Sequence, residues 1–351
     1  MDKLIKIIEE KDCRAIAIVG MTKNVGKTVT LNRLIAEFEK KRLTTGLVSA
    51  GYDGERFDRL TLKEKPRIYA PQGAYAATAG ACFEAAEAEL VLIETSDLST
   101  PLGLIIIAGV KAGGLIELAG PGSVSGLKKL TARMFALGAE YILVDGAINR
   151  MASASPQVTD GTILATGASL GPTMEDVVKK TAFRLKLMET PTVSEALLLK
   201  VAKKGLAEGS AAVVYRSGDT YRVEAIKAAI PLLAVRQALA KFSKETAAFV
   251  FGGALVDDII TELMKLTPNP PPVIVKDATK LFLTPGTFSR FTDRGGRIMA
   301  INRLNLLAVT INPTDPSGRD YNPDIFLARM TEALSPCPVF DLVLEGKLKD
   351  Q

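Results

Sequence analysis

Short apolar runs alternate with helical periods along the first half of the chain. Ala15–Val19 is a continuous apolar run and predicts a buried strand. The apolar residues Leu31, Leu34, Ile35 and Phe38 then recur at the spacing of one helix face, so a helix is expected directly after that strand. The same reasoning predicts strands at Thr44–Glu55, Glu89–Ser96, Tyr141–Ala147 and Gly161–Ala168, and a helix with Leu127, Leu130 and Met134 on one face.

This alternation predicts an α/β fold. Strands that alternate with helices form a mostly parallel sheet with helices on both faces, and buried parallel strands have continuous apolar sequences, as these do. One exception is expected where the apolar runs "GLIIIAGV" and "LIELAG" flank Gly113-Gly114. Two runs joined by such a short turn predict an antiparallel hairpin within Gly103–Gly120.

The second half of the chain repeats the pattern after a polar helical stretch, Thr190–Ser210, where we expect the domain junction. We therefore expect a first domain at residues 1–195 and a smaller α/β domain at 196–351, which would contact a substrate or a partner. Asn322-Pro323 has the residue types of a helix N-cap and first turn. Strands are predicted from "AAVVYR", "AAFVFGG", "PPVIVKD", "LLAVTINP" and "PVFDLVL", and a further helix from Val256, Ile259, Ile260 and Leu263.

Composition excludes several classes of chemistry. The chain has 351 residues and no histidine, which rules out a Ser-His-Asp triad and histidine acid–base catalysis. Its three cysteines, Cys13, Cys82 and Cys337, are far apart and fit buried thiols in a reducing compartment. Scattered basic residues and only 6% aromatics do not predict a nucleic-acid groove. No run reaches the roughly 18 apolar residues of a membrane helix, and the charged, periodic N-terminus does not resemble a signal peptide, so we expect a cytoplasmic protein without membrane contact.

The segment "GMTKNVGKTV" joins the first predicted strand to the first predicted helix. A strand, a glycine-containing loop and a helix that begins at a lysine are the parts of a phosphate-binding loop, in which backbone N–H groups and the helix N-terminus hold phosphate. Lys27 would contact the β- and γ-phosphates and Thr28 would bind Mg²⁺. Met21 occupies the usual place of the first glycine, and Gly20 lies one place earlier. The predicted nucleotide contacts are Gly20, Thr22, Lys23, Asn24, Val25, Gly26, Lys27, Thr28 and Val29.

An acidic residue at the end of a neighbouring strand must help to hold the Mg²⁺ of such a site. Asp145 follows the apolar run of "YILVDGA" and is the first candidate, and Glu94 in "VLIE" is the alternative. Asp53 in "SAGYDGE" follows another strand and could position water or Mg²⁺, or it is only a turn residue. Asp160 is expected to be a cap or turn residue. The Asn/Thr-Lys-x-Asp motif of GTPases is missing from the sequence, which favours ATP.

The longer loop resembles that of dethiobiotin synthetase and its relatives, in the branch of P-loop proteins that also includes ParA/MinD-type ATPases. The resemblance implies that the early glycine belongs to a known variant and that Asp145-Gly146-Ala147 is a Walker-B-like segment. ParA/MinD-type ATPases have a signature lysine five places before the invariant one, and here Thr22 occupies that place, with Lys23 next to it. Lys23 would either reach the nucleotide of the other subunit in a homodimer or be a solvated loop lysine.

Several segments between Ile16 and Gly171 together resemble a narrower family, the small P-loop subunit of the lysine 5,6-aminomutase reactivase. They are "AIVGMTKNVGKTVTLN", "SAGYDGE", "KPRIYAPQG", "ELAGPGS", "GAEYILVDGAINRMASASP" and "TDGTILATGASLG". The resemblance implies an ATPase that releases damaged cofactor from an adenosylcobalamin-dependent aminomutase. Its expected partners are that B12-dependent aminomutase and a second reactivase subunit, contacted by the second domain or by Gly103–Gly120.

Two other functions remain open from the sequence. One is an enzyme like dethiobiotin synthetase, which phosphorylates a small carboxylate or carbamate and could hold its anionic substrate with Arg290, Arg294 and Arg297. Those arginines could equally be solvated residues near a helix cap. The other is a nucleotide-binding regulator with little turnover.

Overall fold

The computed structural model describes residues 2–51, 67–147, 154–228 and 230–342. The chain forms two compact units, of which the first combines Met1–Ala182 with Asn305–Gln351 and the second is Phe183–Leu304. This division differs from the expected one at 195/196, because the last part of the chain returns to the first sheet. The second unit is therefore an insertion into the first.

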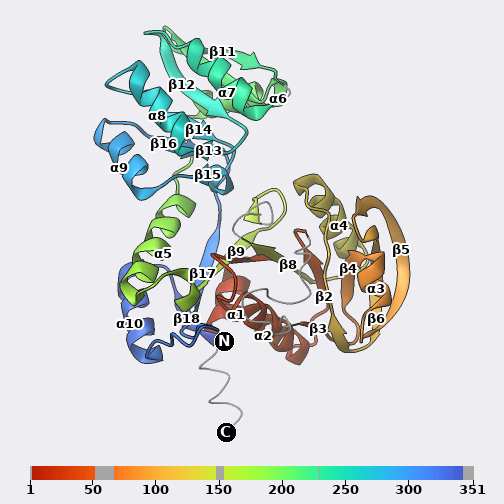
Figure 1. Cartoon of the computed structure of the whole chain (residues 1–351). Helices are drawn as coiled ribbons and strands as arrows, with labels where there is room; N and C mark the ends of the chain where they lie inside the picture. The colour runs from red at the N-terminus through yellow and green to blue at the C-terminus, as the bar shows by residue number, and fades with distance from the viewer. Residues whose placement is uncertain (1, 52–66, 148–153, 229, 343–351) are drawn as a thin grey trace. The chain divides into compact units, whose positions relative to one another are not determined.

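A nine-stranded sheet forms the first unit, in the order β18-β17-β9-β1-β8-β2-β4-β6-β5 (Figure 1). The strands from β18 to β4 run parallel to their neighbours, and β6 and β5 add an antiparallel edge. The bounds are β1 Ala15–Gly20, β2 Thr45–Ser49, β4 Tyr75–Ala79, β5 Glu89–Thr100, β6 Gly103–Ala112, β8 Tyr141–Ala147, β9 Gly161–Gly167, β17 Leu306–Asn312 and β18 Val339–Asp341.

Helices cover both faces of this sheet, as the sequence predicted. Helix α1 (Asp2–Glu10) and helix α2 (Lys27–Lys40) pack on one face, where Leu34 and Phe38 are fully buried with Ile16 and Ile18 of β1. Helix α4 (Val124–Ala136) packs on the other face with Leu127, Leu130 and Met134 against β8. The remaining helices are α3 Gly80–Glu84, α10 Pro323–Leu334 and α5 Met174–Met188, whose last residues belong to the second unit.

Beyond Phe183 a separate five-stranded sheet forms the second unit, in the order β11-β10-β12-β14-β16. The central strands β12 and β14 are parallel, and the hairpin of β10 and β11 is antiparallel. The elements are α6 Ala196–Glu208, β10 Ala211–Ser217, β11 Thr220–Ile226, α7 Pro231–Ala240, β12 Thr246–Phe251, β13 Leu255–Val256, α8 Asp257–Leu266, β14 Val273–Val275, β15 Leu281–Phe282, α9 Pro285–Asp293 and β16 Ile298–Ala300. The smaller α/β unit is thus present, but it ends at Leu304.

The expected hairpin across Gly113-Gly114 does not form. Strand β6 pairs with β4 and β5, whereas β7 (Gly114–Ile116) pairs with β3 (Ile68–Ala70). A Cβ at Gly114 would lie 2.6 Å from the backbone nitrogen of Ala88, so a close backbone approach explains this glycine better than a tight turn does. The expected N-cap is confirmed, because the Asn322 side chain accepts a hydrogen bond from the Ile325 N–H at 3.1 Å.

Gly120 lets the segment before α4 pass very close to the carboxyl end of β2. A Cβ at Gly120 would lie 1.5 Å from the carbonyl oxygen of Ser49, and the Gly120 N–H donates to the carbonyl of Gly51. Only glycine lets the chain pass this close to the end of β2. In the part of the chain that the structure describes, no helix is long and apolar enough to cross a membrane.

Candidate phosphate-binding site

The loop between β1 and α2 has the backbone that phosphate binding requires. Asn24 and Gly26 both have left-handed φ values, 63° and 82°, so the chain turns sharply before α2 begins at Lys27. Gly26 is the N-cap of α2, and with no side chain to cap the helix it leaves the first-turn N–H groups open to an external acceptor. The positive end of the helix dipole favours an anion at this position.

Gly20 is the point where the loop folds back over its own strand. A Cβ there would lie 3.1 Å from Cγ2 of Val25 and 3.2 Å from the carbonyl oxygen of Thr22. Val25 is buried against the strand, whereas Thr22, Lys23 and Asn24 are exposed at the tip of the loop. The lack of a side chain at position 20 therefore lets Val25 anchor the loop, which gives the early glycine a structural reason.

Lys27 and Asp145 form an ion pair at the base of the loop. The Lys27 Nζ lies 3.0 Å from Oδ1 of Asp145 and donates a hydrogen bond to its Oδ2 at 3.2 Å. The two side chains are only 23% and 18% exposed, so both charges are partly withdrawn from water. Strands β1 and β8 are direct parallel neighbours with Ile18 opposite Asp145, so the sheet itself brings this carboxylate to the loop.

Thr28 and Val29 occupy the first turn of α2 and are half-buried. The next hydroxyl group, that of Thr30, is buried and lies 2.9 Å from the hydroxyl of Thr310 on β17. This hydrogen bond fixes the rotation of the helix over the sheet. Thr28 consequently stays at the open end of the helix, where a hydroxyl can bind a cation.

Asn312 is a site residue that the sequence analysis missed. Its Nδ2 donates to the carbonyl of Asn24 at 3.0 Å, and its Oδ1 accepts from the backbone N–H and the hydroxyl of Thr314. A Cβ at Gly26 would lie 3.2 Å from the Cβ of Asn312. Asn312 thus holds the loop at its most strained turn, and its only sequence signal is its place at the end of a predicted strand, "LLAVTINP".

The segment that follows Asn312 is itself braced by Asp315. Its carboxylate accepts hydrogen bonds from the hydroxyls of Ser169 and Ser317 and an ion pair from Arg319. Burial alone would raise the pKa of Asp315, but the hydrogen bonds from Ser317 and Arg319 outweigh it and hold the pKa below its usual value. A charged Asp315 therefore ties the turn after β9 to the segment after β17, beside the loop.

Two other acidic candidates lie elsewhere. Glu94 is on β5, five strands away from β1 in the sheet order, which corresponds to roughly 24 Å at about 4.8 Å per strand. Its carboxylate pairs with Arg133 of α4 at 2.6 Å, so the structure does not bring this alternative metal ligand to the loop. Asp160 accepts hydrogen bonds from the N–H groups of Arg14 and Ala15 at the start of β1, in the turn role expected of it.

Asp53 lies outside the described residues. The segment that leads toward it begins at the carboxyl end of β2, where the Ser49 hydroxyl donates to the carbonyl of Gly51 at 2.7 Å. The backbone N–H of Ala50 donates to the carbonyl of Asp145. The start of this segment is therefore attached to the strand that carries Asp145.

Among the described residues, no group of three or more carboxylate or cysteine side chains gathers as a metal site. Mg²⁺ binds proteins with one or two carboxylates or hydroxyls and takes its other ligands from phosphates and water. Asp145 and Thr28 at the loop fit that pattern. A cation there would depend on a phosphate ligand.

Two of the three arginines proposed to hold an anionic substrate donate to groups of the second unit itself. Arg290 donates to the hydroxyl of Thr287 on its own helix, and Arg294 donates to the carbonyl of Met264. Both side chains and that of Arg297 are on exposed residues. These contacts fit the alternative interpretation of solvated residues near a helix cap.

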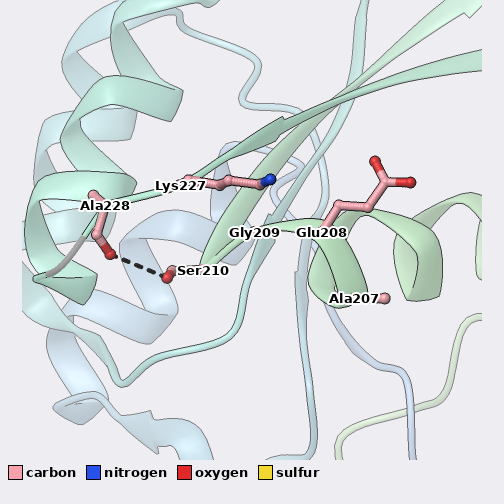
Figure 2. A pocket seen from close by; sticks show the side chains of 6 residues that line it. All are labelled: Ala207, Glu208, Gly209, Ser210, Lys227 and Ala228. Carbon is pink, nitrogen blue, oxygen red and sulfur yellow. Dashed lines mark hydrogen bonds between the residues drawn. The ribbon is translucent and has the colours of Figure 1, made fainter.

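The second unit also has an open pocket, of about 430 Å³. In Figure 2 the polar ends of Lys227 and Glu208 point to one side, while the Ser210 hydroxyl donates to the carbonyl of Ala228 at 3.3 Å. Its other lining residues are Ala207 and Gly209. Its lining offers one cation and one carboxylate, with no further charged group among the lining residues, so it is no second candidate for phosphate binding.

Comparison with known proteins identifies no family. No family model matches the chain, and no curated protein matches it either. A crystal structure of the signal recognition particle receptor FtsY from Elizabethkingia anophelis aligns with 94% of this chain and 70% of its own, at 9% identity and a TM-score of 0.25. The α/β fold and its mostly parallel sheet are compatible with nucleotide binding, and we base the function on the residues of the site.

The contact of Asn312 with the loop predicts that Asn312→Ala weakens nucleotide affinity. Loss of one hydrogen bond of about 1 kcal/mol corresponds to roughly a fivefold rise in Kd. Calorimetric titration with Mg-ATP measures it. Asn305 is the matched control. It lies just before β17, at the end of the strand opposite to Asn312, and it donates to the carbonyl of Asp160. Asn305→Ala should keep the parent's Kd, and equal losses in both variants would contradict a specific brace.

Proposed function

We propose that the chain binds ATP with Mg²⁺ at the β1–α2 loop and hydrolyses it. The observation that carries the proposal is the Lys27–Asp145 ion pair at 3.0 Å, at the N-terminus of a helix whose N-cap has no side chain. A lysine and a carboxylate beside open backbone N–H groups are the groups that a Mg-nucleotide requires. The missing Asn/Thr-Lys-x-Asp motif favours ATP over GTP.

The residues fit the ligand through an exchange of partners. Without nucleotide, Asp145 holds the Lys27 ammonium over the loop and compensates its charge. On binding, Lys27 would donate to the β- and γ-phosphates instead, and the N–H groups of the loop and of the first turn of α2 would hold the remaining oxygens. Asp145 and the Thr28 hydroxyl would then face the cation. Mg²⁺ would supply charge compensation on the phosphate oxygens as the bond to the γ-phosphate breaks.

The finer proposal is that this ATPase helps to reactivate an adenosylcobalamin-dependent aminomutase. Its support is the set of sequence segments between Ile16 and Gly171 that resemble the reactivase subunit. All nine predicted loop contacts lie within one of these segments, and Asp145 lies in another. The second unit, inserted between α5 and β17, is the part we propose for contact with the aminomutase or with a second reactivase subunit.

Lys27→Ala should weaken Mg-ATP binding strongly. The variant loses a charge-assisted contact to phosphate worth about 1.5–3 kcal/mol, which corresponds to roughly a 10- to 100-fold rise in Kd. Calorimetry with Mg-ATP measures the change. Lys40→Ala is the control and should keep the parent's affinity, because Lys40 lies in the last turn of the same helix and pairs with Glu37 one turn earlier. If Lys27→Ala kept the parent's affinity for Mg-ATP, the assignment of the nucleotide site to this loop would be wrong.

Asp145→Asn should separate binding from turnover. The substitution removes the carboxylate that competes with phosphate for Lys27, so affinity for ATP without Mg²⁺ should stay equal or increase. The gain in affinity that Mg²⁺ gives the parent should disappear, and hydrolysis should fall by at least about 100-fold, as for other preorganised charged groups. Glu94→Gln, which alters only the pair with Arg133, should behave as the parent does. The reverse ranking of the two variants would exchange their roles.

The reactivase proposal predicts slow hydrolysis by the chain alone. An ATPase that acts on a partner completes its catalytic site only on docking, so addition of the aminomutase and a second reactivase subunit should raise the rate severalfold. Aminomutase inactivated with damaged cofactor should regain activity only with ATP, Mg²⁺ and fresh adenosylcobalamin. Recovery of aminomutase activity at the parent's rate with Lys27→Ala would contradict ATP coupling.

Two other outcomes would favour the alternative functions. Phosphorylation of a small carboxylate would favour the enzyme like dethiobiotin synthetase, and nucleotide binding with no turnover in any mixture would favour a regulator.

A further inference from the structure

Strand β5 (Glu89–Thr100) is a long strand at the edge of the large sheet. It is the last strand in the sheet order, and within the described ranges it pairs with β6 alone (Figure 1). Its other side therefore presents a row of backbone N–H and C=O groups that can pair with a further strand. The strand contains neither proline nor lysine, two residue types that protect such edges from pairing, and its own protection consists of register shifts against β6 and three acidic side chains.

Three consecutive apolar side chains are exposed on β5. Val91, Leu92 and Ile93 are 51%, 52% and 40% exposed. Alternate residues of a strand normally face opposite sides, but the register between β5 and β6 shifts between Leu92 and Glu94. This bulge lets Ile93 follow Leu92 without returning to the core. The result is a short apolar segment on an edge whose backbone can pair.

The acidic side chains of β5 are all compensated within the chain. Glu89 pairs with Lys111 at 2.5 Å, Glu94 with Arg133 at 2.6 Å and Asp97 with Lys129 at 2.9 Å. The hydrogen bond and charge of Lys129 lower the pKa of Asp97, and those of Glu89 raise the pKa of Lys111, so these pairs stay charged near neutral pH. An edge with compensated charge can approach an identical edge without net repulsion, and it offers no excess charge to a basic or acidic partner.

One antiparallel register of β5 against a second β5 suits these side chains. With Leu92 on the two-fold axis, Leu92 faces Leu92, and by residue count Val91 lies opposite the bulged Ile93. Between residues 89 and 95 the same register sets Glu89 opposite Thr95 and Glu94 opposite Leu90, so no two carboxylates of this span face each other. A two-fold axis at Glu94 would instead place two carboxylates in direct opposition, which is unfavourable across strands.

We propose that two copies of this chain associate through β5, as antiparallel neighbours centred on Leu92, and extend the sheet across a two-fold axis. The association uses a sheet edge five strands away from the Lys27 loop in the sheet order, so it does not depend on the proposed nucleotide function. Cyclic two-fold dimers are the commonest closed assemblies, and pairing of the two edges protects both of them at once.

Disulfide cross-linking tests the register. Facing residues in an antiparallel pair have Cα atoms about 4.5–5.5 Å apart, within the range of a disulfide. Cys13 and Cys82 are buried, so Leu92→Cys in a Cys337→Ser background should give a covalent dimer on mild oxidation. Ser99→Cys is the matched control on the same strand, because its two copies would lie roughly 48 Å apart at about 3.4 Å per residue. Cross-linking at Ser99 but not at Leu92 would overturn the proposal.

Sedimentation velocity of the full chain tests the association itself. The parent should be dimeric, and Leu92→Lys should raise the dimer Kd by at least about tenfold, because two ammonium groups then face each other on the axis. Leu232→Lys is the control on α7 of the second unit, where Leu232 is 46% exposed, and it should stay dimeric. A monomeric parent at every concentration, or a dimer that Leu92→Lys leaves intact, would overturn the proposal. Circular dichroism verifies that each variant is folded. If Leu92→Lys does not fold, the disulfide cross-link at position 92 alone decides whether the proposed dimer forms.

Discussion

The ion pair between Lys27 and Asp145 is the interaction on which the site depends. It joins the first residue of α2 to a strand more than a hundred positions later, and the parallel pairing of β1 with β8 makes it possible. An ion pair at partial burial adds little net stability, because the lost hydration offsets the attraction. Its value is geometric, since each charge holds the other in the position where a phosphate and a cation would use it.

The rest of the first unit keeps that geometry in place. The Thr30–Thr310 hydrogen bond fixes the rotation of α2, and Asn312 supports the left-handed turn at Asn24. On the other side, Gly120 allows the segment before α4 to close against Ser49. These contacts come from opposite ends of the sequence, so the loop is held by the whole sheet and not by its own residues. Such support is what a preorganised site requires.

Local sequence pattern predicted the elements of this fold well and their pairing less well. The strands at Ala15, Tyr141 and Gly161 and the N-cap at Asn322 are where the apolar runs and capping residues indicated, because those signals lie within a few neighbouring residues. Glu94 was a reasonable candidate for the same reason, as it ends an apolar run. Its run belongs to the antiparallel edge, and strand order depends on contacts between distant residues that a single sequence does not display.

The division of the chain and the role of Asn312 were missed for the same physical cause. "LLAVTINP" has the pattern of any buried strand, and nothing in its residues states that it pairs with β9 across an inserted unit of more than a hundred residues. The Gly26-Lys27-Thr28 motif could be recognised because its chemistry lies within one loop. Asn312 could not, because its contact with Asn24 is defined only by the completed sheet.

This arrangement has a consequence for the order in which the protein matures during synthesis. The carbonyl of Asn24 and the amide of Asn312 are separated by 288 positions, so the loop is translated long before its brace. Chains begin to fold from the N-terminal side as they emerge from the ribosome. The inserted unit can fold while the first sheet still lacks β17 and β18. The loop therefore gains this brace only after the chain has been made as far as Asn312, which separates the folding of the parts from the completion of the loop's support.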